Sequence, residues 1–136
     1  MKALSPNTNL FHFWLLILRF VGGGAMLTHG YPKLEKLWEG GNIKFADPIG
    51  LGPEVSLWLV VIAEFACSIL LILGIKTRFV VIPLIITMLV AVFITHASDP
   101  FSKQELGTLY LVLYGTLFFT DGGKFTLVEL IKRFSK

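Results

Sequence analysis

The chain has 136 residues, of which 54% are hydrophobic and only 15% are charged, and its mean hydropathy is +0.75. Soluble domains carry about a quarter charged residues, so this composition indicates an integral membrane protein with the length of one domain. The formal net charge is only +3, and no basic face or basic-aromatic motif gives support to nucleic-acid binding. A single cysteine, Cys67, excludes a disulfide framework within the chain and a cysteine-rich metal site.

Four apolar runs are long enough to cross a membrane. They cover residues 10–29, 55–75, 79–97 and 105–120 approximately, and the fourth is the shortest. The hydrocarbon core of a bilayer needs about 20 helical residues. The sequence therefore predicts an all-α protein, a four-helix bundle in the membrane, with residues 1–136 forming one transmembrane domain.

The basic residues outside these runs are unevenly distributed between the two sides. The side that carries the termini has seven, and the other side has four: Lys2, Lys76, Arg78, Lys124, Lys132, Arg133 and Lys136 against Lys33, Lys36, Lys44 and Lys103. Because lysine and arginine are enriched in cytoplasmic loops, we expect both termini in the cytoplasm.

The first outer link, from Gly30 to Pro53, is long for so small a protein. Its segment "YPKLEKLWEGG" places Leu34, Leu37 and Trp38 at helical spacing, with charged residues between them. Such a pattern is typical of a short helix lying in the membrane interface with its tryptophan at headgroup depth. We therefore predict an interfacial helix in this link.

Two ionisable residues, Arg19 and Glu64, lie near the middle of the first and second runs. Each is ten residues from the expected outer end of its helix, at His29 and Glu54. With a rise of 1.5 Å per residue, both would lie roughly 15 Å below the outer surface. The sequence therefore predicts an Arg19–Glu64 ion pair. Two interpretations stay open: the pair fixes the helix register, or it lines a site for a polar or redox-active ligand.

Two histidines form a second group, since His29 and His96 are expected at the outer ends of the first and third helices. One face of the first helix joins small and polar residues at steps of three and four: Arg19, Gly22, Gly23, Met26, His29, Gly30 and Lys33. The glycines on it are expected to seat a neighbouring helix. The histidines could ligate a metal or haem, contact protons or a ligand, or cap helix ends. We expect no metal site and no haem.

Other polar residues are expected to have structural roles. Tyr110 and Tyr114 share a face of the fourth predicted helix and are more often bundle core than site. Asp99 and Glu105 are expected in a solvated loop and at a helix start. No nucleophile and base have the spacing of a hydrolytic triad.

Four segments together resemble one family of membrane proteins. They are "RFVGGGAMLTHGYPKL", "AEFACSILLILGIKTR", "MLVAVFITH" and "FFTDGGKFTL". The arginine, glycine and His-Gly of the first, the glutamate and Thr-Arg of the second, and the histidine that ends the third are similar to the DoxX family. The chain departs from the family pattern at Asp121-Gly122, where a more glycine-proline turn is expected.

The resemblance implies a four-helix bundle in the bacterial cytoplasmic membrane that serves as a subunit or accessory of a quinone- or sulfur-linked redox system. Its motif positions fall on five candidate ligand-binding residues: Arg19, His29, Lys33, Glu64 and His96. A quinone is left open as a ligand, as are catalytic activity, membrane or peripheral redox-protein partners and a homo-oligomer. Two alternatives also stay open, a non-enzymatic scaffold or assembly partner and, with less support, a small-solute transporter.

Overall fold

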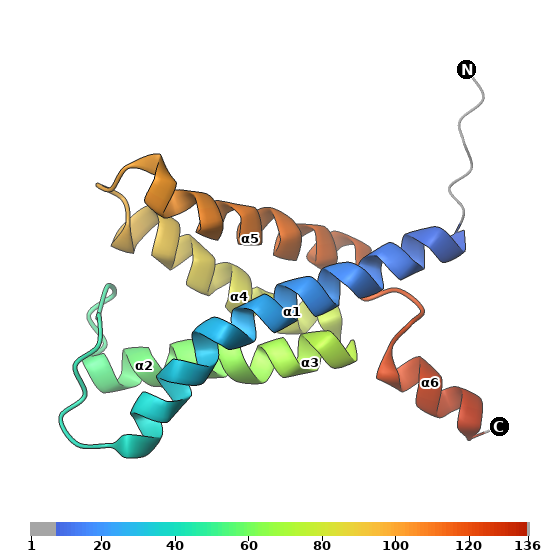
Figure 1. The fold of residues 1–136 in the computed structure, drawn as a ribbon, viewed down its shortest axis with the longest axis horizontal. Coiled ribbons are helices and arrows are strands. Elements are labelled where there is room, and N and C mark those ends of the chain that lie inside the picture. The colour runs from blue at the N-terminus through green and yellow to red at the C-terminus, as the bar shows by residue number, and fades with distance from the viewer. Residues whose placement is uncertain (1–7, 136) are drawn as a thin grey trace.

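The computed structural model describes residues 8–135, in which all regular structure is helical, as predicted (Figure 1). Lys2 and Lys136, two of the seven basic residues counted above, lie outside the described residues. The helices are α1 (Thr8–Glu39), α2 (Pro53–Val61), α3 (Ser68–Leu73), α4 (Thr77–Val90), α5 (Phe101–Thr120) and α6 (Leu127–Phe134). Two π-helical segments complete the set: η1 (Ile62–Cys67) joins α2 to α3, and η2 (Ala91–Thr95) follows α4.

Three helices of the described chain are long and apolar enough to cross a membrane, and they match the first three predicted runs. They are Thr8–Glu39, the continuous helix Pro53–Leu73, and Thr77–Thr95. The fourth run forms α5, which has 20 residues. Its first turns, "FSKQE", carry its charged residues, and α5 is not among the helices that qualify as candidate spans by length and hydropathy.

The helices cross rather than stand parallel (Figure 1). α4 and α5 form one antiparallel pair, and α1 lies across both this pair and the helix Pro53–Leu73. We call the end where α1 begins and α6 lies the terminal end. The opposite end, which carries the link between α1 and α2, is the loop end.

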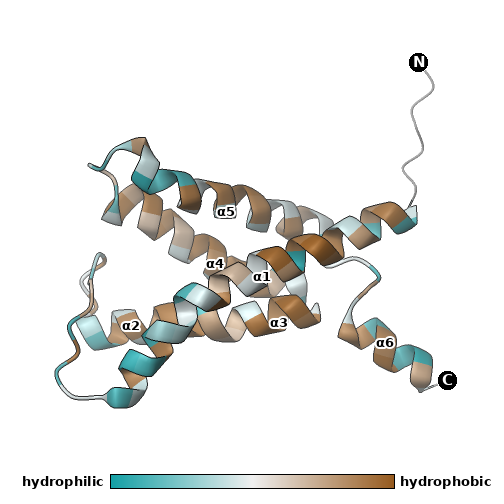
Figure 2. Cartoon of the chain, in the orientation of Figure 1, coloured by the Kyte–Doolittle hydropathy of each residue, from teal (hydrophilic) through white to brown (hydrophobic). Residues whose placement is uncertain are grey.

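The buried core lies where α1 crosses its neighbours. Leu15 and Met26 of α1 pack there with Leu71, Leu84 and Tyr114, each at most 1% exposed. Large apolar side chains also cover much of the outside of the bundle, for example Phe93 and Phe119 at 65% and 80% exposure. In Figure 2 hydrophobic residues recur along all the long helices. An apolar outer surface of this extent fits a lipid environment, in which it is not exposed to water.

The glycines of α1 allow close helix packing, as predicted. A Cβ atom at Gly22 would lie 2.6 Å from Leu113, and one at Gly23 would lie 2.6 Å from Ile72. At Gly30 the Cβ would lie 2.7 Å from the backbone of Glu64. Gly24, which faces away, has no such neighbour within 4 Å. The predicted glycine face is therefore the face that packs against α5 and the helix Pro53–Leu73.

The segment predicted as an interfacial helix is the last part of α1. The helix continues without interruption from His29 to Glu39, through Pro32. The sequence pattern of Leu34, Leu37 and Trp38 is helical as expected, but the segment is not a separate helix. The continuation moves the end of α1 ten residues beyond the predicted position at His29. Residues of α1 therefore lie opposite other residues of the helix Pro53–Leu73 than predicted.

The turns at the terminal end explain two features of the sequence. Gly74 ends α3 in the left-handed conformation with φ of 71°, and the N–H groups of Gly74 and Ile75 donate to the carbonyls of Leu71 and Leu70, both at 3.0 Å. This pattern is a Schellman cap. Arg78 donates from Nε to the carbonyl of Phe118 at 3.0 Å. This carbonyl lies at the C-terminal end of α5, where the helix dipole stabilises a cation.

α6 was not predicted from the sequence. The Thr126 hydroxyl caps its first turn by accepting from the N–H of Glu129 at 3.2 Å. Apolar and charged residues of "LVELIKRF" separate onto opposite faces, and none of its residues is buried. α6 is thus an amphipathic helix that extends away from the core (Figure 2).

Candidate functional site: a polar pocket at the loop end

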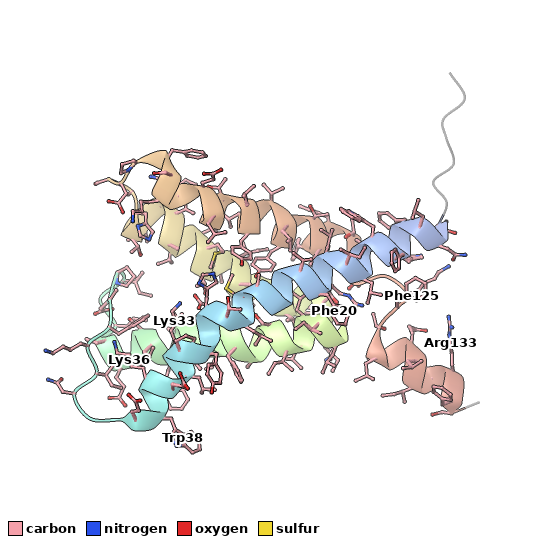
Figure 3. All side chains as sticks on the ribbon, viewed as in Figure 1. Phe20, Lys33, Lys36, Trp38, Phe125 and Arg133 are labelled. Atoms are coloured by element: carbon pink, nitrogen blue, oxygen red, sulfur yellow. The ribbon has the colours of Figure 1, made fainter. Side chains whose placement is uncertain are left out.

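Glu64 forms an ion pair with Lys33. The Lys33 Nζ lies 2.5 Å from the Glu64 Oε2, and the side chains are 29% and 5% exposed. Glu64 lies in the middle of the helix Pro53–Leu73, where α1 approaches closely because Gly30 has no side chain. Figure 3 shows Lys33 on the part of α1 that crosses this helix near the loop end. The nearly buried carboxylate of Glu64 therefore pairs with Lys33, which lies one helical turn after Gly30, the residue of α1 that approaches the Glu64 backbone.

The predicted Arg19–Glu64 pair is wrong. Arg19 donates instead to the carbonyl of Phe125, beyond the terminal end of α3. The prediction assumed that α1 ends at His29, whereas it ends at Glu39. A register shift of ten residues corresponds to about 15 Å along the helix, which places Gly30 and Lys33 rather than Arg19 beside Glu64.

Both π-helical segments occur at this site. Glu64 lies within η1, and His96 directly follows η2. π-helical turns are rare and frequently accompany functional sites, because the extra residue re-aims the side chains that follow. No sequence signal in the chain predicted either segment.

Four of the five candidate residues line one cavity of about 230 Å³. His29, Lys33, Glu64 and His96 line it, and Arg19 does not. The remaining lining includes residues that sequence reasoning did not assign to a site: Met26, Met88, Lys103 and Tyr110. Typical drug-sized ligand sites measure about 300–1,000 Å³, so this cavity, which we call the loop-end pocket, suits a small molecule or the head of a larger one.

The two histidines have different environments in the loop-end pocket. His29 meets the ring of Tyr110 edge-on, with centroids 6.4 Å apart and planes at 89°. The His96 Nδ1 lies 2.7 Å from the Asp99 Oδ2, and the Gln104 side-chain amide donates to the His96 carbonyl at 2.7 Å. Asp99, expected to be only solvated, thus orients the His96 ring.

The two tyrosines join the pocket to the core. Tyr110 stacks on Tyr114 with centroids 5.6 Å apart, and the Tyr114 hydroxyl donates to the carbonyl of Gly22 at 3.1 Å. Both rings are buried, in agreement with the prediction that they belong to the core. Tyr110 is in addition a wall of the pocket. Tyr110 lies two turns after Lys103 on the same face of α5, but this indicates a pocket wall only once the arrangement of the helices is known.

A second cavity, of about 240 Å³, also has Lys33 and Glu64 in its wall. The link between α1 and α2 covers it with Phe45, Pro48 and Ile49. The ion pair is therefore bordered by two cavities, the loop-end pocket with most of the polar groups and this second, mostly apolar one.

Asp47 holds this link in place. Its carboxylate accepts hydrogen bonds from the Ser56 hydroxyl at 2.8 Å and from the N–H groups of Leu51 and Gly52 at 2.9 and 2.8 Å. These donors, with Ser56 first, lower the pKa of Asp47 below its usual value of 3.8. The link is thus fixed to the first turns of α2 at neutral pH.

The groups of the site can form hydrogen bonds and transfer protons. Among residues 8–135, no group of three or more histidine, cysteine, aspartate or glutamate side chains could hold a metal ion. A carboxylate, two ammonium groups, two imidazoles and a phenol line one cavity. Such groups can bind a small polar ring or anion and exchange protons with it.

Comparison with known proteins identifies the family. The DoxX family model matches residues 14–97. The chain belongs to the DoxX family. No curated protein and no solved structure matches it. The matched region of this DoxX protein contains Arg19, His29, Lys33 and Glu64, and it ends immediately after His96.

Proposed function

We propose that this DoxX protein is a subunit or accessory of a membrane redox system, and that its loop-end pocket binds a quinone or a small sulfur-containing molecule. The observation that carries the proposal is the Lys33–Glu64 pair, at 2.5 Å, in the wall of a cavity also lined by two histidines. Ionisable groups within membrane helices are costly and usually mark ligand or proton pathways. Family membership supports a membrane role.

The proposed roles follow from the positions of the groups. Lys33 donates a hydrogen bond to a quinone carbonyl or to an anionic sulfur group, and Glu64 accepts a proton from a quinol whose electrons pass to the redox partner protein. His96, paired with Asp99 and partly exposed, exchanges that proton with the outer solution. Cys67 is a single buried thiol, so thiol–disulfide exchange requires a partner protein.

The proposal includes a topology. Residues 1–136 form one domain in the bacterial cytoplasmic membrane, and α5 is the fourth span of a four-helix bundle, because its 20 residues match the length of the bilayer core. Both termini are cytoplasmic, as the excess of basic residues at the terminal end favours. The loop-end pocket then opens on the outer side, where a redox partner protein or a second copy of the chain would meet it.

The test is to identify what the protein carries when it is purified in mild detergent. We expect a quinone or a sulfur compound to be recovered by organic extraction and mass spectrometry from the wild type, and to be lost from Glu64→Gln and Lys33→Gln. Lys36→Gln is the matched control, because Lys36 lies on the same helix and donates to the Lys44 carbonyl outside the loop-end pocket.

Two outcomes contradict the proposal. One is a wild-type protein that carries neither class of molecule and binds neither a soluble quinone nor thiosulfate when these are added. The other is a charge-swapped protein, Lys33→Glu with Glu64→Lys, that supports full activity of its redox system. The ion pair would then be structural, and a scaffold or assembly role would replace the ligand site.

A further inference from the structure

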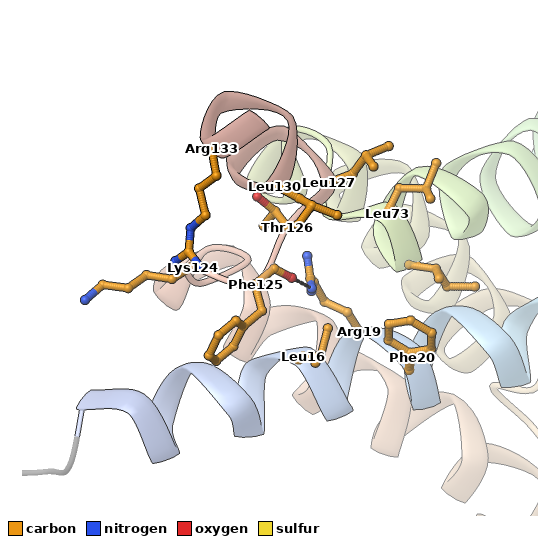
Figure 4. A pocket seen from close by; sticks show the side chains of 11 residues that line it. Leu16, Arg19, Phe20, Leu73, Lys124, Phe125, Thr126, Leu127, Leu130 and Arg133 are labelled. Carbon is orange, nitrogen blue, oxygen red and sulfur yellow. Dashed lines mark hydrogen bonds between the residues drawn. The ribbon is translucent and has the colours of Figure 1, made fainter. Parts of the chain in front are cut away.

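Another cavity, of different chemistry from the two at the loop end, lies at the terminal end. Its volume is about 320 Å³, and it is an open cavity lined by α1, the end of α3, the link after α5, and α6 (Figure 4). The charged side chains that line it are Arg19, Lys124 and Arg133, all cationic. We call this cavity the terminal pocket. No acidic residue lines it among residues 8–135.

Arg19 is the buried group of the terminal pocket. Its side chain is 0% exposed, and one nitrogen donates to the Phe125 carbonyl (Figure 4). Its Nε and its second terminal nitrogen have no hydrogen-bond partner. A buried guanidinium with unused donors is costly, because each donor has lost its water without gaining an acceptor. An anionic oxygen in the pocket would satisfy those donors.

The one acid of α6, Glu129, lies outside the terminal pocket. Glu129 of α6 pairs with Lys132 at 2.7 Å, and Lys132 does not line the terminal pocket. Glu129 also interacts electrostatically with Arg133, but among the described residues no carboxylate lines the pocket beside Arg19, Lys124 and Arg133. Three cations around one cavity favour an anion with several oxygen atoms, and a guanidinium matches phosphate geometry especially well.

The rest of the lining is apolar and continues toward the outside of the bundle. Leu16, Phe20, Leu73 and Leu130 form walls of the terminal pocket. Phe20 is 55% exposed, and the apolar residues of α6 are all at least 36% exposed. Amphipathic helices of this kind lie at the boundary between headgroups and acyl chains. The three cations of the terminal pocket thus lie beside an apolar surface that faces the lipid.

We propose that the terminal pocket binds a phosphate group. The phosphate oxygens accept hydrogen bonds from Arg19, Lys124 and Arg133, and, where the phosphate belongs to a lipid, the apolar tail lies along Leu16 and Phe20. The phosphate belongs to a membrane phospholipid or to a soluble phosphate, and these two sources share the same binding chemistry. The bound anion would tie α6 to α1, because both helices contribute lining side chains.

The experiment measures binding to the full-length protein in a neutral detergent. The probes are short-chain phosphatidic acid, short-chain phosphatidylcholine and inorganic phosphate, and the readout is the dissociation constant from the intrinsic tryptophan signal. We expect tighter binding of phosphatidic acid than of phosphatidylcholine. The double variant Lys124→Gln/Arg133→Gln should weaken binding of phosphatidic acid by about tenfold or more, since hydrogen bonds to charged groups are lost.

The controls separate this site from general surface charge. Lys132→Gln removes a cation from the same helix outside the terminal pocket and should leave the dissociation constant unchanged. Arg19→Gln is expected to weaken binding most, but the double variant keeps the test valid where Arg19→Gln does not fold. If inorganic phosphate displaces phosphatidic acid, the pocket recognises the phosphate group and its ligand is assigned as a soluble phosphate. If inorganic phosphate does not displace it, the ligand is assigned as a membrane phospholipid. Equal binding of phosphatidic acid and phosphatidylcholine, or equal weakening by Lys132→Gln, overturns the proposal.

Discussion

At the loop end, Lys33 faces the carboxylate of Glu64 at 2.5 Å, whereas at the terminal end Arg19 faces the carbonyl of Phe125. The first arrangement has no net charge, and it borders a cavity with proton-exchanging groups. The second has a net positive charge, and it borders a cavity lined by two further cations. One helix, α1, thus presents two cations on one face to two different environments. The comparison shows that the role of a charged residue within a membrane helix depends on the group with which it pairs.

The largest effect is expected when the loop-end pair is broken on the lysine side. Lys33→Met leaves Glu64, 5% exposed, without a counter-ion. Removing one partner of a buried pair costs about 3–5 kcal/mol, and we expect about 3 kcal/mol because Lys33 is partly exposed. Glu64→Gln should cost less, about 1 kcal/mol, since the lysine can extend toward water.

This asymmetry is measurable from the free energy of unfolding in a reversible detergent titration. A charge-swapped double variant should recover most of the loss caused by Lys33→Met. If Glu64→Gln proves more destabilising than Lys33→Met, then the carboxylate has a partner other than Lys33, and the account of the loop end is wrong.

A change of shape rather than charge should affect the same end by a smaller amount. At Gly30 a methyl group would lie 2.7 Å from the Glu64 backbone, so Gly30→Ala forces α1 away from its neighbour. Overpacking of this kind costs about 1–3 kcal/mol. Gly24→Ala is the matched control, because that position is open and alanine favours a helix. Unfolding measurements that give both variants the same stability would refute the close approach.

At the terminal end, Arg19→Met should loosen α6 while leaving the loop end unaffected. The variant leaves the Phe125 carbonyl without its donor, and loss of a hydrogen bond to a charged group costs about 1.5–3 kcal/mol. Hydrogen exchange of the amides in 127–134 should become faster, while that of residues 62–67 stays unchanged. Arg19→Lys should restore part of the protection. Faster exchange around Glu64 as well would show that the two ends are not independent.

The smallest effect is expected in the link over the second cavity. Because hydrogen bonds lower the pKa of Asp47, its stabilising contribution is present above the usual aspartate pKa and is lost as the pH falls through the lowered value. Asp47→Asn should therefore increase hydrogen exchange at Leu51 and Gly52 near neutral pH. The wild type should show the same increase only in strong acid. Identical exchange in both proteins at neutral pH would contradict this role.

The sequence predicted the helical class and the approximate limits of three spans because hydropathy reports them directly. The packing face of α1 was also predictable, since Gly22, Gly23 and Gly30 recur at helical spacing and meet neighbouring helices. The partner of Glu64 was not predictable, because it depends on where α1 ends. The polar pattern of 31–39 was consistent with both a separate interfacial helix and a continuation of α1, and only the latter places Lys33 beside Glu64.

The rest of the candidate site depended on features without a sequence signal. The π-helical turns at Ile62–Cys67 and Ala91–Thr95 alter which residues face inward, and ordinary 3.6-residue periodicity does not reveal them. Tyr110 was recognised as buried, but its contact with His29 requires the relative positions of α1 and α5. Resemblance to the DoxX family selected Arg19 together with the loop-end residues, and their separation became apparent only from the three-dimensional arrangement.

The most direct test of the central claim is a binding titration of a short-chain quinone and of thiosulfate on the wild type, Glu64→Gln and Arg19→Lys. The claim is that the ligand site lies at the Lys33–Glu64 pair and excludes Arg19. We expect one of the two probes to bind the wild type and Arg19→Lys equally, and to bind Glu64→Gln at least about tenfold more weakly, as expected for a lost hydrogen bond to a charged group. Equal weakening in both variants, or no binding of either probe to the wild type, would contradict it.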